Sequence, residues 1–148
     1  MRFRVFSLVI AAAVFAGTTA CDEALSSITG PTPNLEPTLS SIQHEIFDTT
    51  DSSGRLACTN CHNGRNPFVP GNLTAGASYA TLVGTRSVER SALLRVAPGD
   101  PANSYMIHKL EGGPDIVGER MPRGGGPYLT GGQILVIRRW IELGAPNN

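Results

Sequence analysis

The chain has 148 residues, of which 16% are charged and 6% aromatic, and its formal net charge is zero. Two of the basic residues, Arg2 and Arg4, lie in the first 20 residues. The remainder keeps ten basic and twelve acidic residues, for a formal charge of −2. This balance gives no basic surface for nucleic acid.

The first 20 residues have the pattern of an export signal. A short basic region with Arg2 and Arg4 precedes an apolar run over residues 5–16, and small residues at 17–20 lead to Cys21. The apolar run is shorter than the roughly 20 apolar residues that a membrane-spanning helix needs. Small residues directly before a cysteine resemble the processing site of bacterial lipoproteins. That resemblance implies a lipidated Cys21 as the new N-terminus, and a protein held at the periplasmic side of a membrane or at the cell surface.

The number of cysteines agrees with lipidation. The chain has three, and if Cys58 and Cys61 act as a pair, Cys21 is left without a partner unless it is modified. Thr18 departs from the lipoprotein pattern, which has a larger aliphatic residue there. The alternative is an ordinary secretory signal that is cut near Ala20 and leaves Cys21 as a free thiol.

Residues 21–38 are rich in Ser, Thr, Asn and Pro, and their closely spaced prolines predict a tether with neither helix nor central strand. Residues 39–148 then have the size of one small domain with one core. The first helix is predicted over residues 39–49, where one apolar face is formed by Leu39, Ile42, Ile46 and Phe47. His44 lies off this face and is interpreted as a solvent-facing residue.

The motif Cys58-Thr59-Asn60-Cys61-His62 is typical of covalent haem attachment. In a helical turn, residues three apart lie on one side, so both sulfurs can bond to the edge of one flat haem. His62 can then give an imidazole nitrogen to the iron. The motif therefore predicts one haem c with Cys58 and Cys61 as thioethers and His62 as the proximal iron ligand.

Two other sites use a Cys-x-x-Cys pair. A dithiol redox centre would need a strand before the motif and a helix after it, but the flanking residues 51–55 and 64–67 are typical of loops. A zinc site would need two more ligands, and the only other histidines, His44 and His108, are isolated in the sequence.

After the motif we predict a short helix over residues 75–83, an extended apolar piece at 92–96, and a helix opened by Asp100 and Pro101 and ended by Gly112. Residues 111–127 are too rich in Gly and Pro for regular structure. The last helix is predicted over 131–143. Its capping box is formed by Thr130 and Gln133, and its apolar side by Ile134, Ile137, Trp140 and Ile141.

The order of these features resembles the class I cytochrome c fold of bacterial mono-haem cytochromes. The resemblance covers residues 39–146. It rests on Ile46-Phe47 before the haem motif, on Pro98-Gly99-Asp100-Pro101, on Arg120-Met121-Pro122, and on the last helix with Trp140. It implies an all-α fold of about four helices with long loops around a covalently bound haem. The residues 51–56, which look like an insertion, are expected to lengthen a loop without touching the haem.

The resemblance implies Met121 as the distal axial ligand, and a thioether in a Gly- and Pro-rich loop has little packing use otherwise. Met106 is a competitor, interpreted as an ordinary core residue of its helix. His108 would give a bis-histidine haem, but its spacing favours a surface edge. Arg120, Arg123 and Trp140 are candidate partners of the haem propionates, with solvated loop charges as the alternative for the two arginines.

The function expected from this pattern is transfer of single electrons by a protein that is not an enzyme and takes no small-molecule substrate. Its partners would be redox proteins of a respiratory chain, with a lipid anchor holding it to the membrane. One alternative is a haem enzyme or gas sensor with an open or weakly held sixth position. Another is an exported binding module without haem, in which Cys58 and Cys61 form a disulfide.

Overall fold

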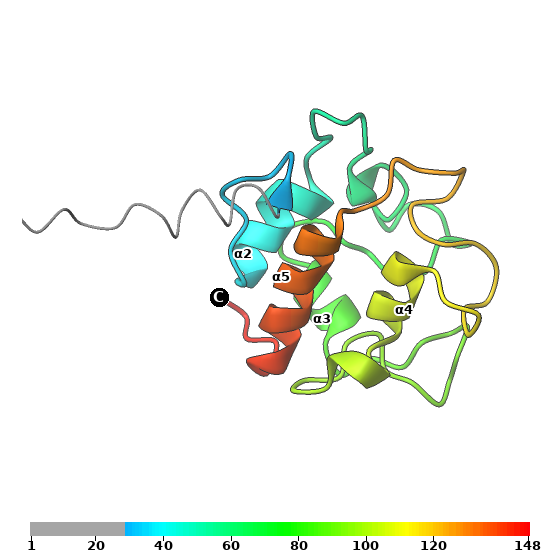
Figure 1. Ribbon diagram of the computed structural model, residues 1–148. Helices are drawn as coiled ribbons and strands as arrows, with labels where there is room; N and C mark the ends of the chain where they lie inside the picture. Colours follow the sequence, from blue (N-terminus) through cyan, green and yellow to red (C-terminus); the bar gives the residue numbers. More distant parts are fainter. Residues whose placement is uncertain (1–28) are drawn as a thin grey trace, which may run out of the picture.

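The computed structural model describes residues 29–148, which form a small helical domain (Figure 1). The predicted signal segment and Cys21 lie outside the described residues. The α-helices are α2 (Leu39–Ile42), α3 (Ser78–Leu82), α4 (Tyr105–Glu111) and α5 (Gly131–Glu142). Within residues 29–148 there is no strand element, only isolated β-bridges such as Val83 with Val96. Helices without a sheet, as found within these residues, are compatible with the predicted all-α fold.

The first predicted helix is present but changes its geometry halfway. Thr38 caps α2 by accepting a hydrogen bond from the Ser41 amide, and the chain continues as a π-helical turn over Gln43–Phe47. In that turn the Asp48 amide reaches back five residues to the Gln43 carbonyl, at 2.9 Å. The wider turn keeps Ile46 and Phe47 buried beside α2.

The domain begins earlier than the predicted boundary at residue 39. Leu35 is only 1% exposed within the hydrophobic core, and the Thr32 hydroxyl accepts a hydrogen bond from the buried side-chain amide (Nε2) of Gln133 at 3.0 Å. Part of the segment predicted as a tether therefore packs on the domain, because a leucine among its polar residues reaches the core.

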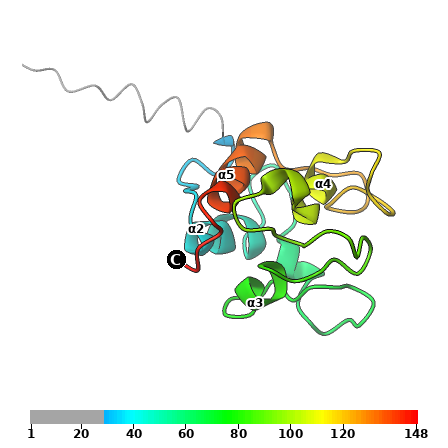
Figure 2. The same cartoon turned by 90° about the horizontal axis from the view of Figure 1, so that it is seen from below.

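Among the elements within residues 29–148, the last helix, α5, is the longest, and its predicted cap is confirmed. Thr130 and Gln133 bond each other's backbone amides in a capping box. Figures 1 and 2 show α2 beside one flank of α5 and α4 beside the other. The chain end returns to α2, where the Ser40 amide donates to the Asn148 carbonyl. The shared core includes Ile42, Ile107, Ile137 and Trp140.

The helix predicted from Asp100 to Gly112 is interrupted. Asp100 caps a separate 3-10 turn, Pro101–Asn103, and Ser104 is extended with ψ of 108° before α4 begins at Tyr105. The buried Ser104 hydroxyl accepts from the Ala97 amide and donates to the Asp100 carbonyl, which holds the break in place. Gly112 ends α4 in the left-handed conformation, as predicted.

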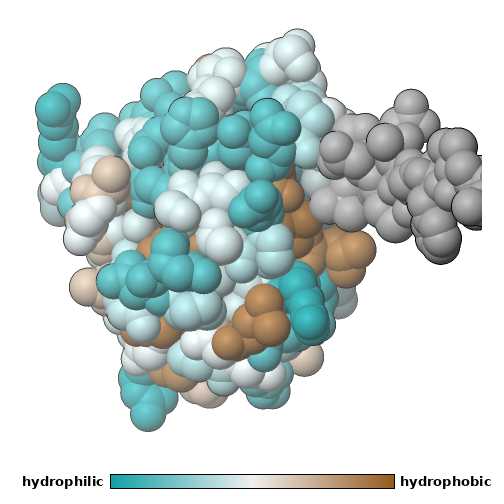
Figure 3. Space-filling model, turned by 90° about the vertical axis from the view of Figure 1, so that its left-hand side faces the viewer, coloured by the Kyte–Doolittle hydropathy of each residue, from teal (hydrophilic) through white to brown (hydrophobic). Residues whose placement is uncertain are grey.

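Loops make up much of the rest of the domain. Figure 3 shows the face on the side of α2 and the C-terminus, where polar residues predominate and hydrophobic ones stand between them. None of the helices within residues 29–148 is long and apolar enough to span a membrane.

Candidate functional site

A cavity of about 510 Å³ lies between the π-helical turn, the Cys58–His62 segment, α4 and the loop that precedes α5. Its size falls within the usual range of cofactor sites, which is roughly 300–1,000 Å³. Most of its deep wall is apolar and comes from the core: Ile46, Phe47, Leu73, Leu82, Leu110, Leu129 and Ile137. Such a wall suits a largely apolar ligand.

The Cys58–His62 segment forms a tight turn at one side of this cavity. Cys58–Asn60 is a 3-10 turn, and the amides of Cys61 and His62 both bond to the Cys58 carbonyl, at 3.2 and 2.9 Å. All three predicted attachment residues, Cys58, Cys61 and His62, line the cavity. Both cysteines are free thiols, without a disulfide between them. The turn therefore presents two sulfurs and an imidazole to one space.

The position of the His62 ring is fixed by a backbone carbonyl. His62 Nδ1 lies 3.0 Å from the carbonyl oxygen of Pro70, which can only accept, so Nδ1 carries the proton. The Leu73 amide donates to the His62 carbonyl at 2.8 Å and holds the same loop against the turn. In the neutral ring, this tautomer leaves the lone pair of the other nitrogen, Nε2, free to bind a metal. A second partner on the far nitrogen is the usual arrangement of a metal-binding histidine.

The Cys58 thiol is poorly suited to dithiol redox chemistry. Burial raises its pKa to about 11, more than the nearby Arg55 charge lowers it. Reactive redox cysteines instead have depressed pKa values, because the thiolate is the nucleophile. A protonated thiol in an apolar wall favours a structural or attachment role.

Met121 and Met106 both line the cavity and both are half-buried. Met106 projects from α4, whereas Met121 lies in the irregular segment before α5, its amide bonded to the Lys109 carbonyl at 2.8 Å. His44 and His108 do not line the cavity. His108 bonds the Ala102 carbonyl through Nε2, and His44 faces Glu45 at the surface.

The three residues predicted to bond haem propionates lie in different places. Arg123 lines the cavity and pairs with Glu119 at 3.3 Å. Arg120 points elsewhere: its Nε donates to the Leu110 carbonyl at 2.7 Å and its guanidinium lies over the Tyr128 ring. Trp140 is fully buried in the core and donates its indole N–H to the Pro146 carbonyl. The structure thus brings only Arg123 of the three to the cavity.

The loop 51–56, which the sequence predicted would not touch the haem, reaches the cavity. Arg55 and Leu56 are part of the cavity wall. Arg55 is buried against Asp51, with Nε 3.0 Å from the carboxylate, and its other nitrogens donate to carbonyls of Glu45, Ile46, Thr49 and Leu56. The pattern Asp-x-x-x-Arg, four residues apart, was the available sequence signal.

Sequence reasoning also missed a polar cluster in the cavity wall. Lys109 is 8% exposed, and its ammonium lies 3.2 Å from the Glu89 carboxylate. Tyr105 donates to the same Glu89 carboxylate at 2.8 Å. All three residues line the cavity. No local pattern predicts this cluster, because Glu89 comes from a loop well before α4.

These donors fit a covalently attached haem. Two thiols, an imidazole nitrogen and a thioether sulfur face one apolar cavity, and a soft iron ligand set of this kind needs only one His and one Met. Within residues 29–148, no three His, Cys, Asp or Glu side chains gather as another metal site would need.

No family model, curated protein or solved structure matches this chain. The cavity and the residues that line it are therefore what indicates a function.

Proposed function

We propose that the helical domain described above is a c-type cytochrome domain that would bind one haem through Cys58 and Cys61, with His62 and Met121 as iron ligands, and that it carries single electrons. The observation that supports this most is the meeting of all four side chains on one apolar cavity. They come from segments that lie far apart in the chain, a 3-10 turn at Cys58–Asn60 and the irregular segment before α5.

The protein residues account for the chemistry expected of a carrier. When bound, haem supplies an iron that gains and loses one electron. His62 offers Nε2 because Pro70 holds the proton on Nδ1. Met121 would offer its thioether sulfur as the second ligand. If both side chains held the iron, no position would be left for a substrate, which separates a carrier from an enzyme or gas sensor.

The apolar wall contributes by keeping water from the ligands. Leu82, Leu110 and Ile137 line the cavity within the core. A low-polarity surrounding disfavours the more highly charged oxidation state, and a Met ligand acts in the same direction. Both effects favour the reduced state relative to a solvated, bis-histidine site.

Haem staining of a denaturing gel tests the proposal, because only covalent haem survives denaturation. The chain is produced in the periplasm of a host that attaches haem to exported cytochromes. We expect a stained band for the wild-type protein and for Cys21→Ser, and none for Cys58→Ala/Cys61→Ala. An unstained wild-type band would overturn the proposal and leave an exported binding module as the better interpretation.

We also propose that the domain lies outside the cytoplasm, held to a membrane by a lipid. A lipid-anchored Cys21 would hold it at the periplasmic side of a membrane or at the cell surface, where redox proteins of a respiratory chain could reach it. Two or more acyl chains anchor a protein stably, where one alone is marginal. Cys21→Ser should therefore move a haem-loaded protein into the soluble fraction. A mutant that stays with the membrane as before would mean that another segment is the anchor.

A further inference from the structure

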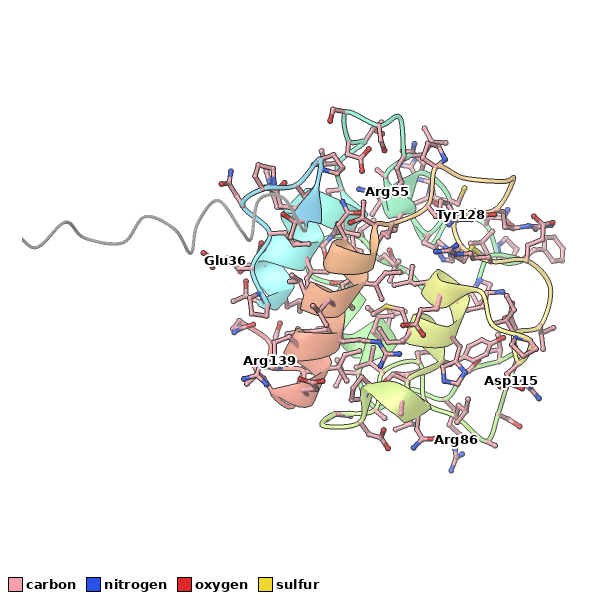
Figure 4. The ribbon with its side chains drawn as sticks, viewed as in Figure 1. Glu36, Arg55, Arg86, Asp115, Tyr128 and Arg139 are labelled. Carbon is pink, nitrogen blue, oxygen red and sulfur yellow. The ribbon has the colours of Figure 1, made fainter. Side chains whose placement is uncertain are left out.

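The irregular segment that carries Met121 is attached to α4 by side chains. Residues 113–123 contain no helix, and the amides and carbonyls of this segment have few partners within it. Figure 4 shows Asp115 at the outer edge of the segment, at the side of the domain away from α2. A methionine in such a segment needs bonds from neighbouring elements to keep one position.

Val117 is held at both of its backbone groups. The Lys109 ammonium donates to the Val117 carbonyl at 2.8 Å, and the Val117 amide donates to the Tyr105 hydroxyl at 2.9 Å. Tyr105 and Lys109 are four residues apart on α4 and so lie on the same side of the helix. Two consecutive turns of α4 therefore grip one residue of the segment.

Glu89 joins the two α4 side chains. One of its carboxylate oxygens accepts from the Tyr105 hydroxyl at 2.8 Å and lies 3.2 Å from the Lys109 ammonium. Glu89 itself is fixed by a turn in which the Ser87 hydroxyl accepts from the amides of Glu89 and Arg90. Lys109 and Tyr105 are 8% and 4% exposed, so these bonds are made in a setting of low polarity. Such buried networks are rigid when every group is satisfied.

The backbone of Lys109 also holds Met121. The Lys109 carbonyl accepts from the Met121 amide at 2.8 Å, so one residue of α4 contacts both ends of the Val117–Met121 stretch. Arg120, next to Met121, adds a bond to the Leu110 carbonyl. The spacing between these anchors leaves Met121 little freedom to leave the cavity.

We propose that the Glu89–Tyr105–Lys109 network, in which Tyr105 and Lys109 are buried and Glu89 is partly exposed, positions Met121 at the cavity and would thereby keep the sixth ligand position closed. The ligand role rests on the function proposed above, whereas the fastening of the segment does not. These are positioning residues, since they act on Met121 through the backbone of the segment.

Tyr105→Phe is the main variant, because it removes only the hydroxyl that links Glu89 to the Val117 amide. Lys109→Met is the second, and removes the bond to the Val117 carbonyl while keeping an unbranched side chain. Two controls match them. Tyr79→Phe removes the hydroxyl of a half-buried tyrosine of α3 that does not line the cavity, and Ile141→Val weakens the core within α5.

The first measurement is hydrogen exchange of the Val117 and Met121 amides in the purified full chain. Loss of the Tyr105 hydroxyl should speed exchange at Val117 by about fivefold or more, the ratio that corresponds to the net free energy of one hydrogen bond. Lys109→Met should speed it at both amides. The controls should leave both amides as in the wild-type protein, relative to the rest of the domain.

The second measurement is the rate of cyanide binding to the oxidised protein. We expect binding several-fold faster in Tyr105→Phe and Lys109→Met, with the haem stain unchanged, and no acceleration in the controls. Network variants that lose thermal stability but keep wild-type cyanide rates and Val117 exchange would overturn the proposal. An unstained wild-type protein would overturn the proposed function and the ligand role together. The exchange data would then decide separately whether the network fastens the segment.

Discussion

The Arg55 guanidinium and the Asp51 carboxylate form an ion pair of 3.0 Å in which the side chains are 1% and 2% exposed. Figure 4 shows Arg55 in the interior of the domain, whereas Arg86 and Arg139 extend from its periphery. Every remaining N–H direction of Arg55 is used on backbone carbonyls of the π-helical turn and the loop that follows it. Arg55 thus joins the end of the first helix to the segment that leads into Cys58.

Replacing Arg55 by Met should cost about 3–5 kcal/mol in the free energy of unfolding, because removal of one partner leaves a buried charge uncompensated. Arg138→Met is the matched control. Arg138 pairs with Glu111 at 2.8 Å, but both side chains are substantially exposed, and exposed pairs contribute about 0–1 kcal/mol. Denaturant unfolding of both variants measures the difference. Equal costs would mean that the Arg55 pair is no more important than a surface pair.

The same pair predicts a dependence of stability on pH. Burial acts to raise the pKa of Asp51, but hydrogen bonds from Ser53 and the charge of Arg55 outweigh it, so the pKa lies below its ordinary value. A depressed folded pKa means that the stabilisation is complete above the unfolded pKa and is lost as the pH falls through the folded one. Asp51→Asn should therefore be less stable than the wild-type protein at neutral pH, and the gap should narrow below about pH 4. A gap that is constant from neutral to acidic pH would contradict this.

Local patterns predicted the helices that end or begin with a cap. The Thr130 and Gln133 capping box and the Gly112 stop are both found where the sequence places them. The break at Ser104 could not be predicted, because it depends on a hydroxyl that bonds Ala97 and Asp100 across a turn. Propensity alone continues the helix through that position.

The structure gathers most of the residues that the sequence singled out. Cys58, Cys61 and His62 were identified by their motif and Met121 through the family resemblance, and all four line one cavity. Their role as haem ligands stays a prediction. Trp140 and Arg120 have the right chemistry for propionates, but their N–H groups bond carbonyls elsewhere. The pairing of Glu89 with Lys109 was missed because the two residues lie far apart in the chain. Arg55 was missed although its ion-pair partner Asp51 lies only four residues before it.

At Gly112, the addition of a single methyl group should lower the stability of the domain. Its φ is +76°, and a Cβ there would lie 2.6 Å from Cδ of Arg120. Gly112→Ala should therefore cost about 1–2 kcal/mol, from the left-handed backbone and the displaced arginine. Gly113→Ala is the control, since no atom lies within 4 Å of its added Cβ and its φ is not positive. Thermal unfolding of both variants decides the point, and similar melting temperatures would count against the close approach of Arg120.

Met121 and Met106 offer a matched pair for the sixth ligand, because both are half-buried methionines that line the cavity. If Met121 holds the position, the oxidised protein should show the weak near-infrared band of sulfur-to-iron charge transfer. Met121→Ala should abolish the band, allow carbon monoxide to bind the reduced protein, and lower the reduction potential, because a thioether ligand favours the reduced iron.

Met106→Ala should keep the band and the closed sixth position. Truncation of this half-buried side chain should still lower the free energy of unfolding, by about 2 kcal/mol or more. Absorption spectra and a redox titration of the two variants separate the ligand from the packing residue. Loss of the band in Met106→Ala alone would reverse the assignment. A wild-type protein that lacks the band and binds carbon monoxide rapidly would instead favour the sensor or enzyme alternative, since its sixth position would then be open to exogenous molecules.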